Sequence, residues 1–349
     1  MSNSNTRCKG YATYHHLMSR IAHKVYFLTD EVRNDFIEMI RRAADFTGVR
    51  LISWCIMTNH FHLLVYLPEP EDLNEAEVLR RYGVLKGKVR LAALEKELAS
   101  LRCKKNGEAE VQKRLDEIKR PMYDIGKFMK IIKQWMTQEY NRRYSHTGTL
   151  WEAVYRDVPV AGSPDELGKR AGYIHLNPIR AAMTDDFAGY PWSSFTALRR
   201  GDEVALSGMR LIYGPAAERD EIFEAHHELM STLLEQMKLE KAQDVARRRL
   251  AGFDVPIDPL TTEALVAQEA EHIKRVQDES VKEKTVRRVK GRPAKATNLE
   301  MEIRKFLALN PNLNADAIVE ATGCSRTAVY RYLRRIRPRY AAKSQKSRK

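Results

Sequence analysis

The chain has 349 residues, of which 43% are apolar and 30% charged, the ordinary proportions of a soluble globular protein with two or three domains. No stretch approaches the ~18 apolar residues of a membrane span, and the first residues lack the apolar segment of a signal peptide, which disfavours the membrane and secreted classes. The cysteines stand far apart without a C-x-x-C pair, so a disulfide scaffold or zinc finger is disfavoured and a reducing cytoplasm is expected.

The net charge of +14 is concentrated at one end of the chain. Residues 281–349 hold 19 Lys or Arg and 5 Asp or Glu, a difference that equals the whole excess. A near-neutral body with a basic tail indicates a polyanionic partner, most simply nucleic acid. The alternative is a basic tail that is only solvated.

Residues 11–67 predict the order β-α-β-β. Apolar residues at helical spacing predict a helix at 30–46, which Thr47-Gly48 ends. Runs of β-branched and large apolar residues predict strands at 14–21, 49–57 and 60–67.

The middle of the chain is predicted to be mainly helical. Residues 71–120, rich in Glu, Lys, Arg, Leu and Ala, predict a long helix or a helical hairpin inserted into the domain. Residues 122–140 predict a further helix, and 150–160 predict a strand. Residues 219–250 are again helical in pattern, and a break with two prolines follows at 251–259.

A first candidate site lies on the strand predicted at 60–67. Successive side chains of a strand point to opposite faces, so His60 and His62 share one face with Leu64. The other face, which begins with Phe61, is wholly apolar and is expected to meet the helices. Two imidazoles side by side can chelate one cation; the alternative is a pair of surface or hydrogen-bonded histidines.

A second candidate site is Tyr173 with Asn177, four residues apart on one face of a predicted helix. This helix begins at Ser163, because Pro164 suits its first position and Glu166 lies three residues after the cap. It is expected to end at Asn177 and the proline that follows. The tyrosine hydroxyl could be a nucleophile, with the asparagine oxygen near the same metal; the alternative is a packing tyrosine at a helix end.

Other residues compete for these roles. Tyr140 continues the buried stripe of its predicted helix and is expected in the core, whereas Tyr144 lies among basic residues and is a candidate contact for the DNA backbone. His15 and His16 are alternative metal ligands, ranked lower because adjacent residues of a strand point to opposite faces.

These motifs carry a resemblance to a known family. The stretch 57–65, MTNHFHLLV, resembles the histidine–hydrophobic–histidine signature of the HUH single-strand nucleases and transposases. The stretches 173–181, YIHLNPIRA, and 190–194, YPWSS, resemble the second signature of the REP-associated tyrosine transposases. The resemblance covers residues 8–200, with 71–120 as an insertion.

The resemblance implies a role for each matching residue. His60 and His62 would hold a divalent metal, Mg or Mn, with Asn177 at the position of the third ligand. Tyr173 would attack a metal-polarised phosphate, form a 5′-phosphotyrosine link and free a 3′-OH.

The basic C-terminal end predicts a helix-turn-helix. Short helices fit 299–309, 314–322 and 326–336, with Gly323 at the turn. The residues expected to contact phosphates and base edges are Arg326, Thr327, Tyr330, Arg331, Arg334 and Arg335. The stretch 290–293, KGRP, is similar to the core of an AT-hook, so Arg292 is a further candidate for DNA contact. The alternative is a helical hairpin with a solvated basic face.

The sequence therefore predicts an α+β protein with an antiparallel sheet and helices on one face, of the HUH nuclease and transposase type with a ferredoxin- or RRM-like core. A helical connector and an all-α helix-turn-helix are expected to follow. The predicted domains are a catalytic domain at 8–200 with the insertion 71–120, a helical connector at 201–281, a basic linker at 282–297, a DNA-binding domain at 298–340 and a basic tail at 341–349.

The expected activity is cleavage and rejoining of single-stranded DNA at hairpin-forming repeats, in the cytoplasm at the bacterial nucleoid. The expected partners are hairpin DNA at the catalytic domain and duplex DNA at the C-terminal domain, with no membrane; related transposases are often dimers, which makes a homodimer a further expectation. The main alternative is a DNA-binding regulator that has lost catalysis, and the intact His60, His62 and Tyr173 argue against it. A replication initiator or relaxase of the same superfamily would commonly carry paired tyrosines or a helicase domain, which we do not find.

Overall fold

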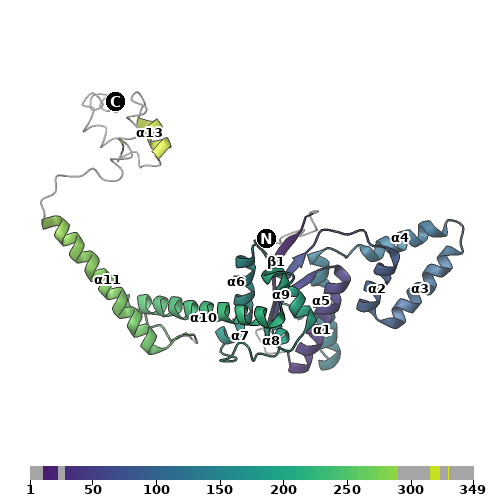
Figure 1. Ribbon diagram of the computed structural model, residues 1–349, viewed down its shortest axis with the longest axis horizontal. Helices are drawn as coiled ribbons and strands as arrows, with labels where there is room; N and C mark the ends of the chain where they lie inside the picture. Colours follow the sequence, from purple (N-terminus) through teal and green to yellow (C-terminus); the bar gives the residue numbers. More distant parts are fainter. Residues whose placement is uncertain (1–10, 23–27, 259, 290–314, 323–328, 330–349) are drawn as a thin grey trace. The chain divides into compact units, whose positions relative to one another are not determined.

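The computed structural model describes residues 11–22, 28–258, 260–289, 315–322 and 329 (Figure 1). The described residues up to Glu271 form one compact unit, and those from His272 onward form a second. None of the described helices is long and apolar enough to cross a membrane.

Four strands form one antiparallel sheet in the order β2-β3-β1-β4. The strands are β1 (Thr13–Arg20), β2 (Arg50–Ile56), β3 (His60–Leu67) and β4 (Arg156–Val160). In the central pair Met18 lies opposite His62, and Ser19 lies opposite Phe61. The predicted α+β class and the antiparallel sheet are confirmed.

The predicted strand at 150–160 is shorter than expected, because its first half leaves the sheet. β4 begins at Arg156, opposite Met18, and the next contact with this edge is an isolated bridge from Trp151 to Ile21. Between these two points, the backbone N–H of Glu152 donates to the carbonyl of Arg20 at 3.1 Å, but residues 153–155 are not paired with β1.

α1 (Asp30–Thr47) and α5 (Ile125–Tyr144) cover the apolar face of the sheet. Thr29 caps α1 by accepting a hydrogen bond from the backbone of Val32, and Gly48 ends the helix in the left-handed conformation at φ 75°. On the sheet, Phe61 packs edge-on against Phe36 of α1 with ring centroids 5.2 Å apart.

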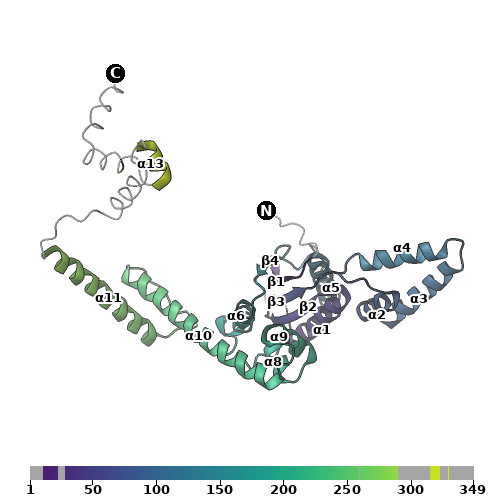
Figure 2. The ribbon, with the colours of Figure 1, turned by 45° about the horizontal axis from the view of Figure 1, so that its top comes forward.

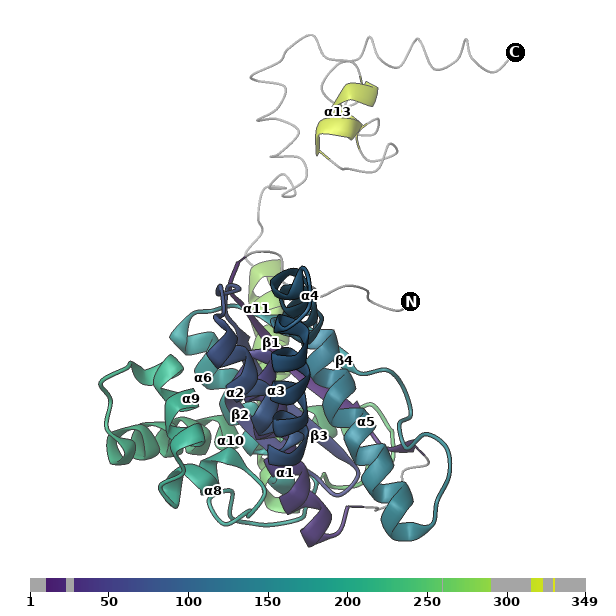
Figure 3. The ribbon, with the colours of Figure 1, turned by 90° about the vertical axis from the view of Figure 1, so that its right-hand side faces the viewer.

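α6 (Pro164–His175) lies on the other side of the strands, together with α9 (Glu203–Tyr213) (Figures 2 and 3), so helices cover both faces of the sheet rather than the one face predicted. Ser163 caps α6 by accepting a hydrogen bond from the backbone of Glu166, as predicted. The expected stop at Asn177 is a bend, since the short helix α7 (Asn177–Arg180) follows almost at once.

Helices from the end of the predicted catalytic domain and from the predicted connector pack together in this first unit. α8 (Ser194–Arg199), α9 and α10 (Arg219–Leu250) contact one another, and α9 also lies against β2. A Cβ atom on Gly208 of α9 would lie 2.2 Å from the carbonyl oxygen of Leu51, so only glycine permits this close approach. α11 (Glu263–Val289) follows.

The insertion is three helices rather than one long helix or a hairpin. They are α2 (Glu75–Lys86), α3 (Lys88–Arg102) and α4 (Gly107–Lys119). Gly87, at φ 86°, separates the first two helices. α3 and α4 extend away from the sheet (Figure 1).

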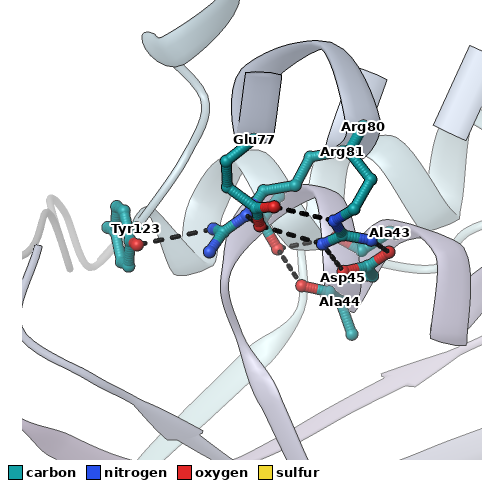
Figure 4. Close-up of polar contacts among 8 residues, drawn as sticks. Ala43, Ala44, Asp45, Glu77, Arg80, Arg81 and Tyr123 are labelled. Carbon is teal, nitrogen blue, oxygen red and sulfur yellow. Dashed lines mark hydrogen bonds and ion pairs between the residues drawn. The ribbon is translucent and has the colours of Figure 1, made fainter. Parts of the chain in front are cut away.

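A cluster of charged groups fastens α2 to α1 (Figure 4). The guanidinium of Arg80 donates to both carboxylate oxygens of Asp45, at 2.9 and 2.7 Å, and also to Glu77. Arg81 donates to Glu77 at 2.7 Å and to the hydroxyl of Tyr123 at 3.4 Å. This bidentate geometry sets the orientation of the insertion at its base, although exposed pairs add little stability.

In the second unit, α13 (Ala315–Thr322) lies where the helix at 314–322 is predicted. Ile318 and Val329 are fully buried, as the core of a small helical domain requires. Apart from Val329, the helices predicted at 299–309 and 326–336 lie outside the described residues, as does the stretch 290–297.

Candidate functional site

His60 and His62 project from β3 on the same face, with ring centroids 5.1 Å apart. Nδ1 of His60 lies 2.7 Å from Oδ1 of Asn59, and Nδ1 of His62 lies 3.0 Å from Nε2 of His16. The Nε2 atom of either ring makes no hydrogen bond with any residue that the structure describes.

These contacts suit a pair of metal ligands. Asn59 Oδ1 is an acceptor only, so Nδ1 of His60 donates and its Nε2 carries the lone pair. The same holds for His62 when its Nδ1–H donates to His16. A hydrogen bond from one ring nitrogen orients the imidazole and leaves the other nitrogen for a cation.

Burial keeps these imidazoles neutral. The pKa of His60 is lowered to about 4, mainly by burial and to a smaller extent by the charge of Arg20. Burial lowers the pKa of His62 to about 2, with smaller effects from His60, His16 and nearby arginines. Near pH 7 a cation therefore displaces no proton from either ring.

His16 takes a larger part in the site than the sequence predicted. It lies opposite Leu64 in the sheet and so shares the face of His62. His15 points the other way, where its Nδ1 lies 2.8 Å from Asp157. The alternation of side chains along β1 therefore places His16 on the face of His62 and His15 on the opposite face. The sequence alone does not distinguish the two residues, because the choice depends on how β1 pairs with β3.

Tyr173 reaches this face from α6. Its ring lies edge-on to His16, with centroids 6.2 Å apart, so His16 contacts both His62 and the tyrosine. The guanidinium of Arg180 lies 4.6 Å from the centre of the Tyr173 ring, and that of Arg170 lies 6.0 Å from it.

Most of the hydrogen-bonding capacity of the Asn177 side chain is used at the C-terminal end of α6. Its Nδ2 donates to the carbonyls of Tyr173 and Ile174, both at 3.1 Å, and its Oδ1 accepts from Arg180 at 3.2 Å. Oδ1 keeps one lone pair. Within the described part of the chain, no three His, Cys, Asp or Glu side chains form a metal-binding group, so a third protein ligand would have to be of another kind.

Four arginines surround the imidazoles and the tyrosine. Arg20, Arg156, Arg170 and Arg180 each contribute to lowering the pKa of one or more of the three histidines. None of them forms an ion pair with a described residue. Unpaired cations around neutral imidazoles create a positive potential that suits a phosphate.

A buried hydrogen-bond network holds α6 in place. Nε2 of His175 lies 2.7 Å from the hydroxyl of Ser194, which accepts from the backbone N–H of Trp54 in β2 at 2.9 Å. Nδ1 of His175 lies 2.9 Å from Nε2 of His226, and Nδ1 of His226 lies 2.8 Å from the hydroxyl of Tyr213. The helix that carries the tyrosine is thereby linked to β2, α8, α9 and α10.

The stretch 190–194 completes this attachment. The Tyr190 hydroxyl donates to the carbonyl of Ile56 at 2.9 Å and accepts from Arg33 at 3.0 Å. The carbonyl of Trp192 accepts from the backbone of Ile56 at 3.0 Å. This part of the second motif therefore holds the structure together beside β2 rather than contributing groups to the histidine face.

The competing tyrosines lie on α5, under the apolar face. Tyr140 is buried, as predicted, and Tyr144 is 46% exposed. The residues predicted to contact DNA at the C-terminal end all lie outside the described residues: Arg292, Arg326, Thr327, Tyr330, Arg331, Arg334 and Arg335.

Replacing His226 with Gln is expected to make the unfolding free energy fall less as the pH is lowered. Burial lowers the pKa of His226 to about 3 from its ordinary 6.5, so below pH 6.5 the unfolded chain takes up a proton that the folded chain does not. This group therefore costs about 1.4 kcal/mol of unfolding free energy per pH unit in that range. Urea unfolding at pH 7.5 and 5.5 should show a loss about 1 kcal/mol smaller in the variant, whereas equal losses in both proteins would contradict a neutral buried His226.

Comparison with known proteins gives one family. Residues 9–77 match the family model described as "Transposase IS200 like". The matched stretch runs from β1 to the start of α2, includes both histidines of β3 and stops before α6. No curated protein matches the chain. A solved structure described as a REP-associated tyrosine transposase bound to a REP hairpin is similar, with a TM-score of 0.35 and 13% identity over 58% of this chain and 87% of that one.

Proposed function

We propose that this chain, whose residues 9–77 match the IS200-like transposase model, cleaves and rejoins single-stranded DNA by attack of Tyr173 on a phosphate. The observation that carries the proposal is the approach of α6 to the histidine face, which brings Tyr173 against His16 and so beside the His60–His62 pair. The hairpin substrate follows from the likeness of 173–181 to the second signature of the REP-associated tyrosine transposases. The proposed location is the cytoplasm, at the nucleoid.

A divalent cation, Mg or Mn, suits the residues present. His60 and His62 would hold it through Nε2, and the remaining lone pair of Asn177 Oδ1 is the candidate third donor. When bound, it would polarise the scissile phosphate and offset negative charge in the transition state.

The residues of the chain account for the remaining steps. Arg170 and Arg180 attract the phosphate to Tyr173 and stabilise the negative charge that develops on its oxygen. The tyrosine oxygen forms a bond to phosphorus while the bond to the 3′-oxygen breaks. The phenol loses one proton and the departing 3′-oxygen gains one, so no other reactant is consumed. The phosphotyrosine link keeps the bond energy that rejoining needs.

A DNA-binding regulator without catalysis is the competing function. Such a protein would need the basic surface but not two neutral imidazoles with free Nε2 atoms beside a tyrosine. The retained arrangement of His60, His62 and Tyr173 favours the enzyme.

We also propose that the basic C-terminal end of the chain binds duplex DNA through a helix-turn-helix. Its support is the helix α13, the burial of Ile318 and Val329, and the 19 Lys or Arg within 281–349. This second DNA contact would hold the enzyme near its single-stranded target.

Tyr173→Phe removes one hydroxyl and is expected to abolish the covalent adduct while leaving hairpin binding intact. The measurement is a denaturing gel of labelled hairpin DNA after incubation with protein and Mn. Tyr144→Phe, an exposed tyrosine on α5, is the matched control and should form the adduct normally. An adduct that persists in the Tyr173 variant would overturn the assignment.

Replacing His60 and His62 together with Ala is expected to eliminate Mn binding without unfolding the sheet, because both side chains lie off the apolar face. Asn59→Ala should weaken binding by about 10-fold or more, since it frees the His60 ring to turn. Electron paramagnetic resonance of added Mn measures both effects. His15→Gln, on the opposite face, should bind Mn as the wild type does, and unchanged binding in the double variant would refute the metal site.

Deleting residues 290–349 is expected to lower duplex affinity and flatten its salt dependence, because fewer counterions are released on binding. Adduct formation on the hairpin should persist at raised DNA concentration, since the histidines and Tyr173 remain. Filter binding at several salt concentrations gives both quantities. Equal affinity and equal slope with and without the tail would leave it as a solvated basic segment.

A further inference from the structure

A cavity of about 250 Å³ opens beside the two imidazoles of β3. It forms at the edge of the sheet, where the pairing between β1 and the segment that leads into β4 is irregular. Met18 pairs with Arg156, and the next contact joins Ile21 to Trp151, so two residues of β1 face four residues, 152–155, that bulge outward. Bulges of this kind re-aim side chains and are common next to active sites.

The cavity has apolar walls and a small number of available polar groups. Met18, Ala153 and Tyr155 line it. Glu152, an exposed acceptor, lies at the same cavity.

Two cations complete the surroundings. Arg20 and Arg156 line the cavity, and neither forms an ion pair with a residue of the described chain. Together with the imidazoles they would attract the phosphates on each side of a nucleotide. A nucleotide held there would have its base within reach of the cavity.

We infer that this cavity receives the base of a nucleotide adjacent to the scissile phosphate. The inference rests on the proposed function, because that function sets the phosphate at the imidazole pair. Bases taken out of a stack bind in close-fitting pockets, by stacking on aromatic or apolar side chains and by hydrogen bonds to their edges. Tyr155 and Met18 supply the stacking surface, and Glu152 supplies an acceptor that favours a base with an exocyclic amino group.

The test compares a substitution that fills the cavity with one that does not. Ala153→Phe places a ring in the cavity, whereas Val154→Phe adds one at the neighbouring position, which is 72% exposed and is not part of the lining. The readout is the rate of adduct formation on hairpin DNA, with an abasic nucleotide placed in turn on each side of the mapped link. For the wild type and Val154→Phe, an abasic nucleotide at one of these positions should lower the rate of adduct formation by about 10-fold or more. Ala153→Phe should be slow on intact DNA and insensitive to the abasic change.

Equal rates of the wild type on intact and abasic DNA, or equal behaviour of the two phenylalanine variants, would overturn the inference. A second readout needs no cleavage: 2-aminopurine at successive positions of the strand, bound to Tyr173→Phe protein, should change in fluorescence at one position. Ala153→Phe should remove that change. Absence of any adduct in the wild type would refute the proposed function instead, and the fluorescence would still decide whether the cavity binds a base.

Discussion

The alternation of side chains along β3 is the constraint on which the site depends. Phe61 and Leu63 are fully buried beneath α1 and α5, and their burial holds the strand in register. A slip of one residue would expose these side chains and move His60 and His62 into the core. The hydrophobic contacts that stabilise the domain therefore also keep two neutral imidazoles on the opposite face, where α6 meets them.

The position of α6 depends on polar as well as apolar contacts at its C-terminal end, where Ile174 is fully buried. His175, between Tyr173 and Asn177, is fully buried and hydrogen-bonded on both ring nitrogens. Because every partner in this network is also buried or anchored, a shift of α6 would leave several polar groups without partners in an apolar setting. Such a network fixes the tyrosine helix relative to β2, and a nucleophile that must meet a phosphate needs that precision.

Local signals in the sequence predicted much of this arrangement. The ends of β3 and the cap of α6 at Ser163 were predicted correctly, because alternation and capping depend on neighbouring residues. The contacts that escaped prediction join distant parts of the chain. His16 meets His62 through strand pairing, and His175 meets His226 through packing of α6 on α10. The bulge at 152–155 follows from a mismatch between two pairing registers, which no local pattern encodes.

The central claim is that Tyr173 is the residue that attacks DNA beside the histidine pair. Mass spectrometry of the protein after reaction with hairpin DNA and Mn, nuclease treatment and proteolysis tests it most directly. The account predicts a nucleotide remnant on the peptide that contains Tyr173, attached at that residue. A remnant on Tyr140 or Tyr144, or no modified peptide after exhaustive reaction, would contradict it.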